Sequence, residues 1–166
     1  MDRAQQQEEG GIDGDKRRHL LWMLALATFA IFFQAYMVAP IIPALSTDFG
    51  VPVQTVGLLV PAYLIPYGVA TLLYGLIADR VGIHRVLFLS LALFSALSLL
   101  TTTAHSVEQL IVWRVLTGVG ASGVVPLALT LVGRLFPYEQ RGRPLGWLFG
   151  AMAGGMAFGS PLGTIL

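Results

Sequence analysis

The chain has 166 residues, of which 55% are hydrophobic and 11% are charged, and its formal net charge is +1. A soluble domain carries roughly 25% charged residues, so this chain has too little polar surface for water, and a bilayer is the solvent that permits its composition. The absence of cysteine excludes disulfides, thiolate metal sites and thiol nucleophiles. The charges lie in short clusters and form no nucleic-acid-binding face.

Residues 1–19 are polar and lack periodicity, which predicts a disordered cytoplasmic tail, and residues 20–166 form the predicted transmembrane region. Each apolar run in this region is long enough, at 1.5 Å per residue, to cross about 30 Å of hydrocarbon. The runs are Leu20–Ala39, which is closed by Pro40, Val56–Ala78, Val86–Ala104, Leu110–Leu135 and Leu145–Leu166. They predict an all-α, polytopic bundle of about five transmembrane helices.

Basic residues gather on alternate connections between these runs, whereas the connections at 46–55 and 105–109 contain none. Nine of the ten basic residues lie on one side: Arg3, Lys16, Arg17, Arg18, Arg80, Arg85, Arg134, Arg141 and Arg143. Because basic residues are enriched in cytoplasmic loops, this alternation predicts a cytoplasmic N-terminus in the inner (plasma) membrane.

The tenth basic residue, Arg114, lies inside the fourth apolar run. A charge at such a depth costs on the order of 3 kcal/mol, and it normally faces a cavity or a partner. Snorkelling of the side chain to the outer interface is the alternative.

The connection between the second and third runs has the pattern G-x-x-x-D-R-x-G-x-x-R, formed by Gly75, Asp79, Arg80, Gly82 and Arg85. Gly75 removes a side chain where another helix can approach, Asp79 can cap a helix end, and Gly82 permits a left-handed turn. Physically, the pattern predicts a tight cytoplasmic turn.

This loop resembles the signature loop of the major facilitator superfamily. The segment from Arg114 through Gly118 to Gly120 is similar to the family's R-x-x-x-G-x-G pattern in helix 4, and Pro40 and Pro43 at the end of the first run resemble bacterial drug-efflux-like members. The turn 136–142 fits as well. The likeness extends from about residue 17 to residue 166 and implies the N-terminal part of a twelve-helix fold.

Three positions depart from the family pattern. Ile83 and His84 stand where basic residues are common, and Gln34 stands where many drug/proton antiporters have an acid. The fifth run contains Gly155, Gly159 and Gly163 in a pattern close to, but different from, the antiporter motif G-x-x-x-G-P-x-x-G-G. The antiporter proton site therefore cannot be carried over to Gln34.

The resemblance implies secondary active transport of a small solute by alternating access, with proton-coupled efflux of a drug or metabolite as the expected activity. Arg114 would take part in proton coupling or in orienting the substrate. Asp79 would be a latch between the two halves of the transporter, with a plain helix cap as the alternative. The expected partners are the bilayer, the small-molecule substrate, protons and the missing C-terminal half; no cofactor, metal or enzymatic activity is expected.

Glycines predict the helix packing, because small residues at i, i+4 spacing allow close approach of another helix. The fifth run carries two such rows and a proline that predicts a bend: Gly146, Gly150 and Gly154, then Gly155, Gly159 and Gly163, with Pro161. Gly118 and Gly120 are assigned to packing, since the G-x-G-x-x-G of 118–123 lies within an apolar run and not after a strand.

Residues of helices 1, 2, 4 and 5 are the predicted cavity lining, with ordinary packing as the alternative for each. They are Gln34, Tyr36, Tyr63, Tyr67, Arg114 and Met152. Aromatic and methionine side chains suit bulky apolar cargo.

The fifth run reaches residue 166 without polar flanking residues, which suggests a fragment of a longer transporter. The rival hypothesis is a small, non-transporting membrane protein that assembles with a partner through glycine-rich helices. A membrane-embedded enzyme is poorly supported, because no nucleophile–base or metal constellation is present.

Overall fold

The computed structural model describes residues 3–165, and side chains from 14 to 164, and every regular element in this part of the chain is helical. The α-helices are α1 (Arg3–Phe49), α2 (Val53–Gly57), α3 (Leu59–Val81), α4 (Ile83–Leu100), α5 (Val107–Ala121), α6 (Val124–Leu135) and α7 (Gly142–Ile165). Two 3₁₀ turns, η1 (Thr101–Thr103) and η2 (Tyr138–Gln140), complete the connections. The predicted all-α fold class is confirmed.

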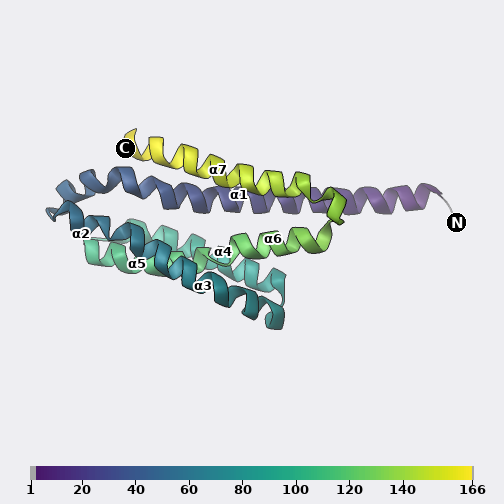
Figure 1. Ribbon diagram of the computed structural model, residues 1–166, viewed down its shortest axis with the longest axis horizontal. Coiled ribbons are helices and arrows are strands. Elements are labelled where there is room, and N and C mark those ends of the chain that lie inside the picture. The colour runs from purple at the N-terminus through teal and green to yellow at the C-terminus, as the bar shows by residue number, and fades with distance from the viewer. Residues whose placement is uncertain (1–2, 166) are drawn as a thin grey trace.

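Four segments of the described chain are long and apolar enough to cross a membrane: 14–49, 53–81, 83–103 and 107–135. The fifth apolar run forms helix α7, which has 24 residues and lies beside α1 (Figure 1). Large apolar side chains cover the outside of the bundle, and Leu72, Phe88 and Leu99 are 71–75% exposed. Such an apolar surface suits lipid, so the helices form a multi-pass membrane bundle.

The membrane-length segments α1, α3, α4, α5–α6 and α7 alternate in direction along the chain, so α1 and α7 run the same way (Figure 1). The turns after α3 and after α6 lie at the end of the bundle from which α1 extends toward the N-terminus. The turns after α1 and after α4 lie at the opposite end. The arginine-bearing turns therefore share one end, as the charge alternation predicts.

The fourth predicted run is two helices, α5 and α6, rather than one, because the helix is interrupted at Ser122 and Gly123. Pro126 has no N–H, so it cannot bond the carbonyl of Ser122 four residues earlier. The hydroxyl of Thr71 in α3 donates to the carbonyl of Tyr67 at 2.8 Å and shares this proton with the carbonyl of Ser122 at 3.3 Å. A neighbouring helix thus partly satisfies the group that proline frees, which helps to make the break tolerable inside a membrane.

Two predicted boundaries of the first helix differ from the structure. Pro40 does not close α1, which continues through Pro40 and Pro43 to Phe49. At the other end, residues 3–19, predicted as part of a disordered tail, are helical, since an existing helix gains one hydrogen bond for each residue added. The first two residues of the predicted tail, and residue 166 of the fifth run, lie outside the described residues.

The α5–α6 segment is the centre of the bundle. In its most apolar stretch 61% of the residues are buried, against 22–28% in the other three spans. Its buried side chains, together with the inner faces of α1, α3, α4 and α7, form the main core; those on α6 are Val124, Leu127, Ala128, Leu131 and Val132. Any side chain on α5 that points toward α3 or α4 is therefore enclosed by protein.

Candidate functional site

Arg114 lies in the middle of α5 and is only 3% exposed. Its guanidinium carbon lies 4.6 Å from the centroid of the Tyr63 ring on α3, which is a cation–π distance. Tyr63 in turn stacks on Tyr67, one turn further along α3, with ring centroids 5.9 Å apart. The guanidinium is thus enclosed between two helices and placed over Tyr63, which itself stacks on Tyr67.

Glycines on α5 bring the neighbouring helices close enough for this contact. A Cβ on Gly118, one turn after Arg114, would lie 2.5 Å from the carbonyl oxygen of Tyr63, so only glycine allows α3 to approach this closely. A Cβ on Gly120 would lie 3.0 Å from the backbone nitrogen of Phe94 in α4. The predicted packing glycines therefore contact two different helices, and the first of them positions Tyr63 against Arg114.

The buried polar atoms around Arg114 are incompletely satisfied. Within residues 14–164, neither Arg114 Nε nor the Tyr63 hydroxyl has a hydrogen-bond partner, and no carboxylate of these residues forms a salt bridge with Arg114. A buried charge without an anionic partner costs stability, because its lost hydration is not replaced. Such a residue inside a membrane span is a functional candidate.

The other predicted cavity residues do not all join this cluster. Gln34 donates from Nε2 to the hydroxyl of Ser98 in α4, at 3.3 Å, and its Oε1 has no partner among the described residues. Tyr36 is 45% exposed on α1, and Met152 is half-buried on α7. The structure therefore brings together Arg114, Tyr63 and Tyr67, whereas Gln34 contacts a helix that was not expected to contribute. Nothing in the sequence predicts Ser98 as the partner of Gln34, because serine is common on membrane helices.

The loop between α3 and α4 is a tight turn, as predicted, and Gly82 has φ of 101°, which an L-residue rarely adopts. A Cβ on Gly75 would meet no atom within 4 Å, so no helix among the described residues makes the predicted close approach there. Asp79 lies 3.7 Å from Arg134 at the end of α6, measured from Oδ1 to Nη2, and both side chains are exposed. Arg134 was missed as a site residue, although its place in the last turn of a helix on the same side was a usable signal. Arg80 and Arg85 are exposed in this region.

Arg141 orders the turn between α6 and α7. Its Nη2 donates to the carbonyl of Gly133 at 2.6 Å and its Nε donates to the carbonyl of Phe136 at 3.0 Å. These carbonyls belong to the end of α6, where helices leave carbonyl groups unpaired. The arginine therefore acts as a C-terminal cap for α6.

The two glycine rows of α7 face different surroundings. Gly155 and Gly159 pack on α1, where a Cβ on either would lie 2.6 Å from a carbonyl oxygen, of Phe29 or Phe33, and Gly163 continues the row against Met37. Gly146 and Gly150 meet no atom within 4 Å, and Gly154 meets only the ring of Phe29. Pro161 lies within α7, between the last two packing glycines. One row is a helix interface, and the other is open.

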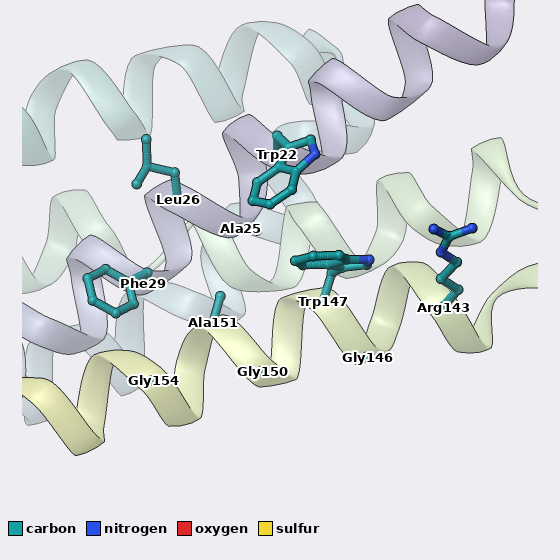
Figure 2. Close-up of a pocket in the computed structure, with 10 residues that line it drawn as sticks. All are labelled: Trp22, Ala25, Leu26, Phe29, Arg143, Gly146, Trp147, Gly150, Ala151 and Gly154. Carbon is teal, nitrogen blue, oxygen red and sulfur yellow. The ribbon is translucent and has the colours of Figure 1, made fainter.

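The open row lines a groove between α1 and α7 (Figure 2). A second groove adjoins it at the arginine-bearing end of the two helices. None of the predicted cavity residues lines either of these two grooves in the described part of the chain. Within that part, no three His, Asp or Glu side chains come close enough together to hold a metal ion.

The fold and the site define a polytopic α-helical membrane protein with a buried intramembrane arginine. The sequence profile of the Major Facilitator Superfamily matches residues 24–166. The chain belongs to the Major Facilitator Superfamily.

Several curated relatives agree with this assignment. The chain is 32% identical, over 81% of its length, to the protein named "Uncharacterized MFS-type transporter Rv1250" of Mycobacterium tuberculosis, of which the match covers 25%. It is 29% identical, over 74% of its length, to the protein named "Putative multidrug resistance protein MdtD" of Klebsiella pneumoniae, of which 26% is covered. It is 26% identical, over 88% of its length, to the quinolone resistance protein NorA of Staphylococcus aureus, of which 38% is covered. The chain therefore spans less than two fifths of the length of these relatives.

Proposed function

We propose that this chain is the N-terminal part of a secondary active transporter that exports a small solute, a drug or metabolite, by alternating access coupled to protons. The observation that carries the proposal is the enclosed position of Arg114 over Tyr63, without an anionic partner among the described residues. A membrane protein that needed only stability would not keep an uncompensated charge there.

The relatives support export over the rival hypothesis of a small assembly protein. Two of the three are named for resistance to drugs, and the third is named as a transporter. The glycine-rich face that motivated the rival is largely used inside the chain, because Gly155, Gly159 and Gly163 pack on α1. No feature of the described chain specifically favours assembly without transport.

In this proposal Arg114 participates in coupling or in orienting the substrate, and Tyr63 and Tyr67 form the aromatic wall beneath it. Gln34 and Met152 would line the same cavity from α1 and α7. The facing wall would come from the C-terminal half of the transporter, so the five helices alone would not transport.

The proposal is tested by efflux from cells, or uptake into everted vesicles, that contain the complete transporter. A panel of fluorescent cationic and neutral dyes is the probe. We expect the dye to accumulate in the everted vesicles only when the vesicle interior is acidic. Accumulation should stop when a protonophore collapses this proton gradient. Dye accumulation that is the same with and without the proton gradient would overturn proton-coupled export. So would a failure of every dye to accumulate.

The proposed orientation places the N-terminus and both arginine-bearing turns in the cytoplasm. Because the chain has no cysteine, single cysteines can report the side directly. In intact cells we expect an impermeant maleimide to label Gln54→Cys and His105→Cys, which lie in exposed positions at the end without basic residues. His84→Cys and Glu139→Cys, at the arginine-bearing end, should react only after permeabilisation; the reverse pattern would invert the topology.

We propose that Asp79 biases the conformational equilibrium through its contacts at the cytoplasmic end. An exposed ion pair such as Asp79–Arg134 contributes about 0–1 kcal/mol to stability, so Asp79→Asn should leave thermal stability nearly unchanged. In the complete transporter the same substitution should alter labelling of a cavity cysteine several-fold. Arg134→Gln is the matched variant that removes the intrachain partner; unchanged labelling in Asp79→Asn would reduce Asp79 to a structural role.

A further inference from the structure

The two grooves between α1 and α7 join into one continuous groove along the outside of this helix pair. Trp22, Ala25, Arg143 and Trp147 line both grooves, which have volumes of about 560 and 750 Å³. Figure 2 shows the two tryptophans and Arg143 where the grooves meet. We refer to the two joined grooves as the α1–α7 groove.

The α1–α7 groove changes its chemistry from one end to the other. Its polar end is lined by Arg17, Arg18 and Arg143 and, among the residues whose side chains are described, by one carboxylate, Glu139. At its other end it is bounded by Leu26, Phe29 and the open glycine row. From Gly146 to Gly154 that row extends about 12 Å along the helix axis at 1.5 Å per residue. The groove is therefore cationic at the arginine-bearing end of the bundle and apolar farther into the membrane span.

Both helices carry the same two residues at the same spacing. Arg18 precedes Trp22 by four residues on α1, and Arg143 precedes Trp147 by four residues on α7. Residues at i and i+4 lie on one face of a helix, and the two helices run in the same direction (Figure 1). The indole rings meet, with centroids 4.7 Å apart. Two arginines thus lie one turn outside a tryptophan pair, which is the order of groups found at a membrane interface.

We propose that the α1–α7 groove binds one anionic diacyl phospholipid. Its phosphate would lie between Arg18 and Arg143, and one acyl chain would lie over the tryptophans and along Gly146, Gly150 and Gly154. Basic pockets between membrane helices on the cytoplasmic side recognise anionic headgroups. The absence of side chains on the glycine row provides the depth for an acyl chain. This proposal concerns a lipid site and does not depend on the transported solute.

Charge complementarity favours a lipid over another helix as the occupant. An apolar helix would cover the glycine row but would leave Arg18 and Arg143 with only Glu139 as a carboxylate among the groove-lining residues whose side chains are described. An anionic amphiphile satisfies both ends at once. A second copy of the chain, or a further helix of the transporter, remains a distinct outcome of the experiment.

The groove contains its own fluorescent reporters. The chain has three tryptophans, and two of them, Trp22 and Trp147, line the groove. In a Trp113→Phe background, all tryptophan emission comes from the groove. The purified chain is titrated with phosphatidylglycerol brominated on its acyl chains, and in parallel with phosphatidylcholine carrying the same chains, in a detergent that does not quench.

We expect saturable quenching by brominated phosphatidylglycerol at concentrations well below those required for brominated phosphatidylcholine. Arg18→Gln and Arg143→Gln should each weaken the phosphatidylglycerol interaction about fivefold, from about 1 kcal/mol per basic residue. Gly150→Leu should reduce quenching by both lipids, because a side chain there fills the apolar part without meeting other atoms. Soluble glycerol 3-phosphate should not compete, because it lacks the acyl chain.

Matched controls separate this site from general attraction to the membrane. Arg85→Gln removes an exposed arginine at the same end of the bundle, and Gly68→Leu adds a side chain at an open position on α3; both should bind as the parent does. Equal quenching by the two lipids would overturn the site. A loss of phosphatidylglycerol affinity in Arg85→Gln as large as in Arg18→Gln or Arg143→Gln would also overturn it. No quenching by either lipid would also overturn the site, because it would mean that no acyl chain reaches the two tryptophans. Native mass spectrometry of the parent chain, counting retained lipids, checks the result without Trp113→Phe.

Discussion

Replacing Arg114 with methionine should abolish transport by the complete transporter while leaving its folding stability unchanged or higher. We expect at least a loss of about a hundredfold in efflux rate, which corresponds to about 2.7 kcal/mol of lost stabilisation of the transport barrier. The stability should not fall, because methionine fills similar space and removes a buried charge that lacks an anionic partner among the described residues. Opposite effects on rate and stability distinguish a functional residue from a packing residue.

Efflux and thermal unfolding of the same purified preparations measure the two effects. Arg114→Lys keeps the charge but loses the planar group that lies over Tyr63, so we expect an intermediate rate. Glu108→Gln, an exposed position on the same helix, should behave as the wild type in both assays. Normal efflux by Arg114→Met would remove Arg114 from the mechanism, and a parallel loss of stability and activity would assign it to packing.

Much of the fold is predictable from the sequence because the bilayer restricts the possible structures. Apolar runs of membrane length must be helical to satisfy their backbone groups, and the alternation of arginines orders the connections. The details that escape prediction depend on neighbours. Pro126 removes the helical partner of the Ser122 carbonyl, where α5 gives way to α6, and Thr71 of α3 contacts that carbonyl, whereas Pro40 lies within a helix that continues to Phe49.

The candidate site is predictable in part for the same reason. Arg114 is conspicuous because a charge inside an apolar run is rare, and no knowledge of the fold is needed to select it. Its contact with Tyr63 depends on how closely α3 approaches Gly118, and the contact of Gln34 with Ser98 depends on the rotation of α1. Helix rotation is a property of the packed bundle, so spacing along one helix does not determine it.

The two glycine rows of α7 illustrate this limit, because both have the same i, i+4 spacing and only one packs on α1. Gly159→Leu should therefore destabilise the bundle by about 3 kcal/mol, since its Cβ would lie 2.6 Å from the carbonyl oxygen of Phe33 and no rotamer avoids a backbone atom. Gly150→Leu, one row away, meets no atom within 4 Å. It should be neutral or slightly stabilising, because leucine is a better helix former than glycine.

Thermal unfolding followed by circular dichroism in detergent compares the two variants. A second measurement reports the interface itself: cysteines at Phe29 and Phe158, whose rings lie 6.4 Å apart, can be joined by a short bifunctional maleimide in the otherwise cysteine-free chain. Cross-linking should persist in Gly150→Leu and fall sharply in Gly159→Leu. Equal stability of the two variants would mean that α7 does not use this row against α1, because the clash exists only if the backbones are in contact.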